Sequence, residues 1–261
     1  MNTYIHYLDN NLIRDFPTDV HYAHAIYGPD LGSIKGKKVR KQPKSVLTQT
    51  ILPLLTRIQD NYSNITICAD IFFLNGSPFM YTISWNIQLR TVEELQSLSY
   101  KHLLQCMRSV IELYNARGFQ VDHPRADNEF EFLTKSIQLV LTHITAKNKH
   151  TPEVEQSIQT IKERVQANIN TFHFNYFPKL MPSHLVLHNV KLLNMFPAAN
   201  GVNNTISPHI IMTRLPCPSF QTFSLRFGSY VQTHEIDNII NNITPRTTRA
   251  ITLTPSNDHG G

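Results

Sequence analysis

The sequence has few charged residues, few cysteines and no long apolar run, and each shortage excludes a class of protein. Charged residues make up only 16% of the 261 residues, and Asn, Thr, Ser and Gln fill much of the remainder. The three cysteines, Cys68, Cys106 and Cys217, lie far apart, which excludes a disulfide scaffold and a CxxC zinc module and fits a reducing compartment. No run approaches the roughly 18 apolar residues of a membrane span, and the N-terminus lacks the features of a signal peptide. We therefore expect a protein that is neither secreted nor embedded in a membrane, with a hydrophobic share of 41% that suffices for a core.

Positive charge exceeds negative charge, and one stretch concentrates it. The formal net charge is +5, which favours a polyanionic partner such as nucleic acid. Residues 31–58 contain no Asp or Glu, and their first half is a glycine- and proline-containing loop with five closely spaced cations, Lys35, Lys37, Lys38, Arg40 and Lys41. Such a loop can follow a phosphate backbone, and a solvated linker is the equally good alternative. We assign residues 1–44 to an N-terminal leader and this basic linker.

Asp70 is the residue around which the rest of the sequence can be organised. It lies in an apolar run of β-forming residues, 65–74, which Asn75-Gly76 connects to a second such run, 78–84. Two apolar strands joined by Asn-Gly predict a β-hairpin. A buried strand rarely carries an Asp unless the charge has a partner or binds a metal ion. The misplaced carboxylate is therefore the first candidate functional residue.

The remaining periodicities predict a mixed α/β domain. We expect a helix from residue 45 to about 58, strands at 86–94, 119–123 and 138–145, a short helical piece after 126, and helices at 99–117, 153–170 and 182–197. Three strands in a meander followed by alternating helices and strands indicate a mixed sheet covered by helices. We assign residues 45–200 to this domain and 201–216 to a linker. Short strands within 217–261 predict a small β-barrel that is cut short.

Two further carboxylates can join Asp70. Asp127 follows the fourth predicted strand, and Glu155 lies in the first turn of the helix at 153–170. If the strands of Asp70 and residues 119–123 are neighbours, both Asp side chains reach one edge of the sheet, and the helix brings Glu155 over them. Clustered carboxylates repel one another unless a hard cation such as Mg²⁺ or Mn²⁺ bridges them. Two such ions can activate a water or hydroxyl for attack on a phosphodiester.

Several motifs, in order, resemble the integrase of copia-type LTR retrotransposons over about residues 25–261. They are Tyr27–Arg40 (YGPDLGSIKGKKVR), Asp70–Gly76 (DIFFLNG), Ala126–Phe130 (ADNEF), His150–Arg164 (HTPEVEQSIQTIKER) and Phe227–Glu235 (FGSYVQTHE). The resemblance implies an RNase H-like fold, a mixed five-stranded sheet flanked by helices, followed by the small C-terminal barrel. It also implies a D,D,E site in which Asp70, Asp127 and Glu155 hold two Mg²⁺ (or Mn²⁺) ions.

The resemblance further implies a reaction and partners. The family processes the 3′ ends of element DNA with water and then joins the new 3′-hydroxyl to target DNA. Gln159 and Lys162 match positions that contact the element's DNA end. The cations of the basic loop, residues 35–41, are further candidates for binding DNA. The partners would be element ends, target DNA and further copies of the same chain, with no membrane. The place of action would be the nucleus or a cytoplasmic element particle.

Two alternatives stay open. Glu153 rivals Glu155 as the third acid, and Glu155 is preferred because Glu-Gln-Ser-Ile-Gln-Thr resembles the family's Glu-Arg-x-x-Arg-Thr. Gln156 and Gln159 then stand where arginine is expected, which would remove two phosphate-binding charges. The family's His/Cys zinc module is also missing upstream. A non-catalytic nucleic-acid-binding relic, as a fragment or decaying copy, is the alternative to an active Mg²⁺-dependent enzyme.

Overall fold

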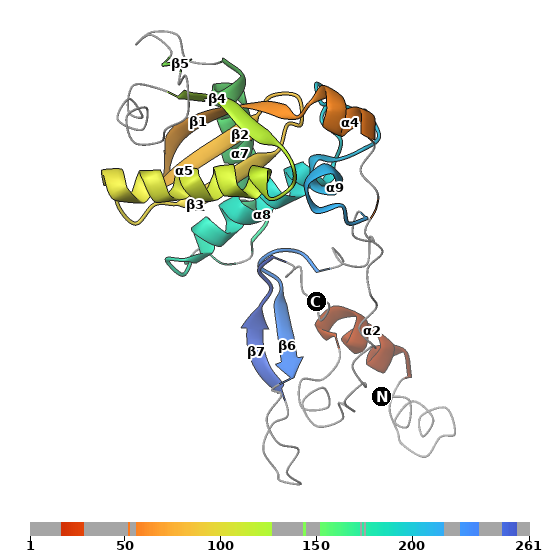
Figure 1. Cartoon of the computed structure of the whole chain (residues 1–261). Helices are drawn as coiled ribbons and strands as arrows, with labels where there is room; N and C mark the ends of the chain where they lie inside the picture. The colour runs from red at the N-terminus through yellow and green to blue at the C-terminus, as the bar shows by residue number, and fades with distance from the viewer. Residues whose placement is uncertain are drawn as a thin grey trace. The chain divides into compact units, whose positions relative to one another are not determined.

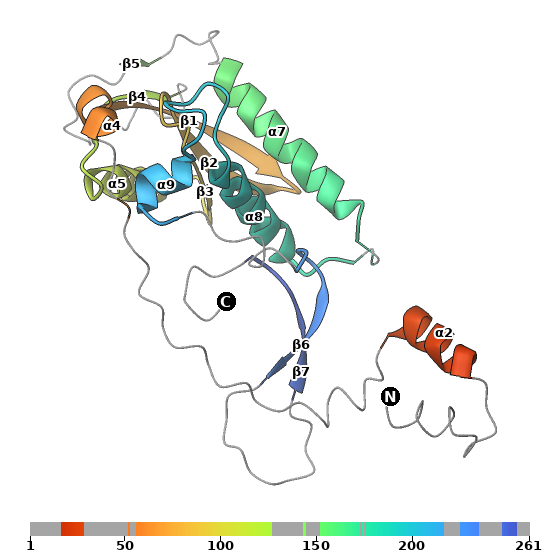
Figure 2. The same cartoon turned by 90° about the vertical axis from the view of Figure 1, so that its right-hand side faces the viewer.

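The computed structural model describes most of the chain, and its helices and strands are shown in Figures 1 and 2. The chain divides into two compact units, residues 45–229 with 252–261, and residues 1–44 with 230–251. Among the helices of the described part, none combines the length and apolar character needed to cross a membrane. The described residues are 17–28, 52, 56–126, 143–144, 152–172, 174, 176–216, 225–234 and 247–254.

The larger unit is built on a five-stranded mixed sheet with the order β3-β2-β1-β4-β5. Its strands are β1 (Asn64–Leu74), β2 (Ser77–Ser84), β3 (Arg90–Glu94), β4 (Gln120–Ala126) and β5 (His143–Ile144). β1, β2 and β3 form an antiparallel meander, whereas β4 and β5 run parallel to β1. This arrangement confirms the predicted mixed sheet, with the Asp70 strand at its centre.

The predicted hairpin forms because its two turn residues accept left-handed backbone angles. Asn75 and Gly76 have φ values of +48° and +82°, as a two-residue turn matched to the twist of the strands requires. The next connection differs from the prediction, since β3 begins at Arg90 and not at residue 86. Asn86 and Gln88 have positive φ values of +34° and +59°, so the backbone turns there before the strand can start.

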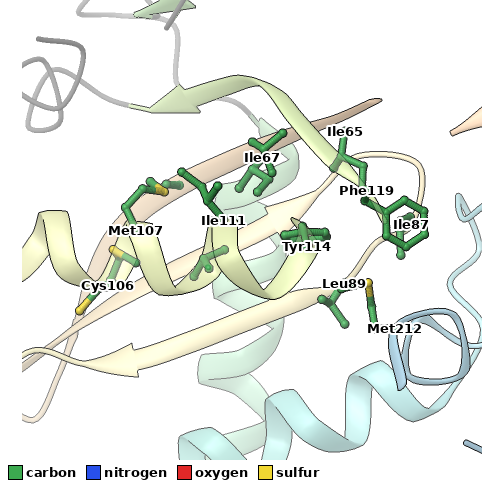
Figure 3. Close-up of a cluster of buried hydrophobic side chains, with 14 of the residues drawn as sticks. Ile65, Ile67, Ile87, Leu89, Cys106, Met107, Ile111, Tyr114, Phe119 and Met212 are labelled. Carbon is green, nitrogen blue, oxygen red and sulfur yellow. The ribbon is translucent and has the colours of Figure 1, made fainter. Parts of the chain in front are cut away.

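Helices cover both faces of the sheet (Figure 2). They are α4 (Thr56–Asn61), α5 (Tyr100–Asn115), α7 (Pro152–Ile169), α8 (Met181–Met195) and α9 (Pro208–Thr213). Alternate residues of β1 point to opposite faces. Ile65, Ile67 and Ala69 pack with α5 and α9 in one core cluster, seen in Figure 3. Cys68 and Phe72 pack with α7 and α8 in the other.

The boundaries of several elements differ from the sequence predictions. The helix expected at 45–58 is described only as α4, and the strand expected at 138–145 only as β5; the short helix expected after 126 lies outside the described residues. β4 continues to Ala126, three residues beyond the predicted end. Pro124 obscured this extension, but the segment pairs with β1 through a register shift at Ile65/Thr66. α9 lies within the segment 201–216, and its Ile211 and Met212 are buried in the core.

In its described residues the smaller unit has one helix and one pair of strands. α2 (Pro17–Tyr27) forms in the segment that we expected to be a leader, with Asp19 in its first turn and His24 in its last. β6 (Tyr230–His234) and β7 (Thr247–Ile251) form a two-stranded antiparallel sheet. The described residues of this region contain these two strands and no closed barrel, so the barrel stays a prediction.

A buried histidine, His188, is expected to make the stability of the larger unit depend on pH. His188 of α8 lies 5.2 Å from the Phe227 ring, and its Nδ1 is 2.9 Å from the Thr254 hydroxyl. Burial, and then the nearby Lys191, lower the pKa of His188. Below about pH 6.5 the unfolded chain therefore binds a proton that the folded chain resists.

We expect the free energy of unfolding to be unaffected by His188 above about pH 6.5 and to fall as the pH drops below that value toward the folded pKa. Urea unfolding between pH 5 and 8 measures this slope. His188→Gln is expected to reduce it because the variant has no proton to gain at this position. An identical slope in the two proteins would contradict the prediction.

Candidate metal and nucleic-acid site

Asp70 lies on the face of β1 that α7 covers. It stands between Cys68 and Phe72, which both pack in the cluster beneath α7 and α8, and its side chain is half-buried. Its Oδ1 accepts a hydrogen bond of 2.8 Å from the backbone N–H of Ile71. The structure thus confirms that a carboxylate lies within a largely buried strand. The residue paired with Asp70 in the neighbouring strand β2 is Tyr81.

α7 crosses this face next to Asp70. At one point the Tyr81 hydroxyl lies 2.6 Å from the Ser157 Oγ. Further along the helix, the Lys162 ammonium lies 5.7 Å from the centre of the Phe72 ring, two residues beyond Asp70. The apolar stripe of the helix fixes this position because Val154, Ile158, Ile161 and Val165 are all buried against the sheet. The first turns of α7 are thereby held near Asp70.

Glu155 and Lys162 lie on the same side of α7. They are seven residues apart, which corresponds to an angular difference of about 20° and a rise of about 10 Å. Glu155 is exposed and Lys162 is half-buried. Gln159 lies between them on this side, and its Nε2 donates a 2.9 Å hydrogen bond to Glu163 Oε1. Lys162 lies over Phe72 of β1. Glu155 is on the same side of α7 as Lys162, so it too lies on the side of the helix that faces β1.

Glu153 and Gln156 belong to a different side of α7. Both line a cavity of about 370 Å³ together with Arg90 and Ser157. Arg90 Nε donates to Ser157 Oγ over 3.2 Å, so this side of the helix faces β2 and β3. Glu153 and Glu155, the two candidates for the third acid, therefore lie on different sides of α7.

The second acid and the basic segment lie outside the described residues. β4 ends at Ala126, which pairs with Ala69 of β1, and Asp127 is the next residue in the sequence. Lys35, Lys37, Lys38, Arg40 and Lys41 are likewise outside the described residues. Within the part that the structure describes, no group of three or more His, Cys, Asp or Glu side chains is arranged to hold a metal ion. Asp70 and Glu155 supply the carboxylate oxygens that Mg²⁺ prefers, so the donor chemistry fits this ion.

Sequence reasoning missed a buried polar network beneath α7. Burial raises the pKa of Tyr81 to about 12, and the hydrogen bond to Ser157 and the nearby Arg90 oppose this rise only in part. Tyr81 is therefore a neutral hydrogen-bonding group that joins β2 to α7. The signal available in the sequence was Ser157, a polar residue beside the apolar stripe of the helix.

Comparison with known proteins finds a likeness among solved structures only. No family model matches the sequence, and no curated protein matches it. Among solved structures, the catalytic core domain of BIV integrase matches 56% of this chain and 92% of that domain, with 17% sequence identity and a TM-score of 0.40. A likeness of this size says nothing about chemistry, so function has to be argued from the residues of this chain.

Proposed function

We propose that this protein is a Mg²⁺-dependent polynucleotidyl transferase of the RNase H-like, integrase type, with Asp70, Asp127 and Glu155 as its metal-binding acids. The observation that carries the proposal is the position of Asp70, a half-buried carboxylate on the central strand, on the face that α7 crosses. The order of the strands supports it as well, since β1 lies at the junction between the antiparallel meander and the parallel pair.

The register of β1 and β4 supports Asp127 as the partner of Asp70. Ala69 and Ala126 form the last described pair of this parallel ladder. Asp70 directly follows Ala69 and Asp127 directly follows Ala126 in the sequence, each about 3.8 Å from its alanine in Cα position. Glu155 completes the trio because it shares its side of α7 with Lys162, whose ammonium lies over the Phe72 ring of the same strand.

The reaction needs little from the protein beyond binding metal and holding DNA. Two Mg²⁺ ions held by the three acids would activate the attacking oxygen and stabilise the leaving one. In end processing, water attacks a phosphodiester near the DNA end, which leaves a 3′-hydroxyl on the element. In strand transfer, that hydroxyl attacks a target phosphate and displaces the 3′-oxygen of the target strand. Lys162 and Gln159 would hold the phosphate backbone beside the acids.

The motif resemblance makes the proposal more specific. It points to a copia-type LTR retrotransposon integrase that acts on element ends and target DNA as a multimer, in the nucleus or in an element particle. In this proposal the cations of residues 35–41 follow the DNA backbone, and the region from 217 belongs to a small C-terminal barrel. The net charge of +5 agrees with a DNA partner.

A non-catalytic DNA-binding protein of the same fold is the second candidate. One observation favours it. The side of α7 that carries Glu155 has a single cation, Lys162, and the Gln159 amide on that side is engaged with Glu163 of its own helix. Such a protein would bind DNA in the absence of Mg²⁺, and it would neither cut nor join DNA when Mg²⁺ is present.

A DNA cleavage and joining assay separates the two candidates and tests the third acid. We expect the protein to process and join labelled DNA ends with Mg²⁺ and not with EDTA. Glu155→Gln is expected to lower the rate by at least about a hundredfold because it removes one charged ligand. Glu153→Gln should have a far smaller effect, since Glu153 faces the cavity on the other side of α7.

The outcomes of this assay are decisive. A wild-type protein that binds DNA but never cuts it would support the non-catalytic alternative. Equal losses in the two variants, or a larger loss in Glu153→Gln, would remove Glu155 from the site.

A further inference from the structure

A groove lined by both polar and apolar side chains lies on the side of α7 away from Glu155 and Lys162. Two adjoining cavities, of about 370 and 340 Å³, share Gln88, Arg90 and Asn200 as lining residues. Volumes of this size are typical of sites for small ligands. We call this feature the Arg90 groove and define it by Arg90, Arg164, Gln88, Asn200, Trp85 and Phe196.

Arg90 is fixed in the groove by its surroundings. Its Nε donates to Ser157 Oγ and its Nη1 donates to the Gln88 carbonyl, both over 3.2 Å. Its backbone N–H donates to Asn194 Oδ1 over 2.9 Å, and its carbonyl accepts from Asn194 Nδ2 over 2.7 Å. The guanidinium is thereby oriented before any ligand arrives, which lowers the entropic cost of binding.

The guanidinium retains donors for a ligand. An arginine has five N–H groups, and its interactions with Ser157, Gln88 and Tyr81 leave at least two of them for a ligand. In the described part of the chain Arg90 has no ion pair with a carboxylate, although it is half-buried. A cation held in this way, with a planar set of donors still available, suits a phosphate or carboxylate group.

The rest of the groove adds charge and flat apolar surface. Arg164 of α7 is exposed and lines the second cavity, and Glu153 is the one carboxylate among the described lining residues. Trp85 lines the first cavity and Phe196, which is 66% exposed, lines the second. Gln88 and Asn200 supply amide groups between them. Arginine, aromatic and amide side chains together match the phosphate, ring and edge groups of a nucleotide.

We propose that the Arg90 groove binds a nucleotide, with its phosphate on Arg90 and Arg164 and its base against Trp85 or Phe196. A free nucleotide and a nucleotide within a single strand present the same chemistry. The groove requires no metal ion and lies on a different side of α7 from Glu155, so it is separate from the proposed metal site. Binding here would extend the nucleic-acid surface to the edge of the sheet formed by β3.

Trp85 provides a direct measurement because it is the only tryptophan in the chain. The whole protein is titrated in EDTA with inorganic phosphate, deoxyadenosine monophosphate, a short oligothymidylate and a polyglutamate peptide, while tryptophan fluorescence is followed. We expect a saturable change with the nucleotide or the oligothymidylate. If only the free nucleotide binds, the ligand is a small molecule; if the strand binds more tightly, it is nucleic acid. No response to either, or equal affinity for phosphate alone or for the peptide, would overturn the proposal.

Matched variants locate the binding. Arg164→Gln is expected to weaken affinity roughly tenfold, and Arg90→Gln more, because each removes charge-assisted hydrogen bonds. Arg108→Gln makes the same charge change at an exposed position of α5, on the opposite face of the sheet, and should leave affinity unchanged. Asp70→Asn should also leave it unchanged, which separates this site from the metal site.

Since Arg164 is exposed, its variant remains informative even if Arg90→Gln fails to fold. Equal weakening by Arg108→Gln and Arg164→Gln would show a general charge effect and would overturn the proposal.

Discussion

Asp70→Asn is expected to lower the rate of Mg²⁺-dependent DNA processing and joining by about a hundredfold to a thousandfold. The substitution keeps the shape of the side chain, and an amide oxygen can still accept the hydrogen bond from the Ile71 N–H. It removes the negative charge that would hold the metal ions and so the electrostatic stabilisation of the attacking and leaving oxygens. The rate is measured on labelled DNA ends with saturating Mg²⁺. Asp127→Asn should cause a loss of similar size.

The same variant should also lose stabilisation by the metal. A ligand that binds only the folded state raises the midpoint of thermal unfolding. We expect Mg²⁺ to raise the midpoint of the wild-type protein and to leave that of Asp70→Asn unchanged. Asp60→Asn, an exposed position on α4, serves as the control and should retain both activity and the response to Mg²⁺. Full activity in Asp70→Asn would exclude the proposed metal site.

Gly228→Ala is expected to lower the free energy of unfolding by about 2–5 kcal/mol. Gly228 has a φ of +81°, which costs an L-residue about 1–2 kcal/mol. A Cβ at this position would lie 2.6 Å from Cε1 of Phe172, and overpacking of this kind costs about 1–3 kcal/mol more. Phe172 cannot move aside easily because it packs against Phe174, Phe177 and Phe227. Urea unfolding of the two proteins measures the difference.

Gly76→Ala is the matched control for Gly228→Ala. Its φ of +82° imposes the same backbone strain, but a Cβ there meets nothing within 4 Å. The difference between the two variants therefore isolates the clash with Phe172. The double variant Gly228→Ala, Phe172→Ala should lose less unfolding free energy than the sum of the losses in the two single variants, because removal of the ring removes the clash. Equal destabilisation in the two glycine variants would show that Phe172 accommodates the added methyl group.

Local signals predicted the elements whose structure depends on nearby residues. The prediction of a hairpin at Asn75-Gly76 was correct because both residues tolerate the positive φ that the turn needs. The predictions of α5 and α7 were correct because the buried residues of these helices recur at helical spacing. β4 was predicted too short because its last residues, including Pro124, lack strand character and are held by pairing with β1. α2 lies in a segment whose pattern gave no helical signal.

The sequence by itself determined that Asp70 is a charge within an apolar strand and that a helix with Glu155 and Lys162 on one side follows. Those facts depend only on residue type and periodicity. Only the tertiary structure decided that α7 packs on the face of β1 that carries Asp70, and that Glu153 faces a cavity on the other side. The Arg90 groove was likewise invisible in the sequence, because residues from β3, α7 and the segment after α8 form it. Such contacts arise from packing between segments distant in the chain, which no local pattern encodes.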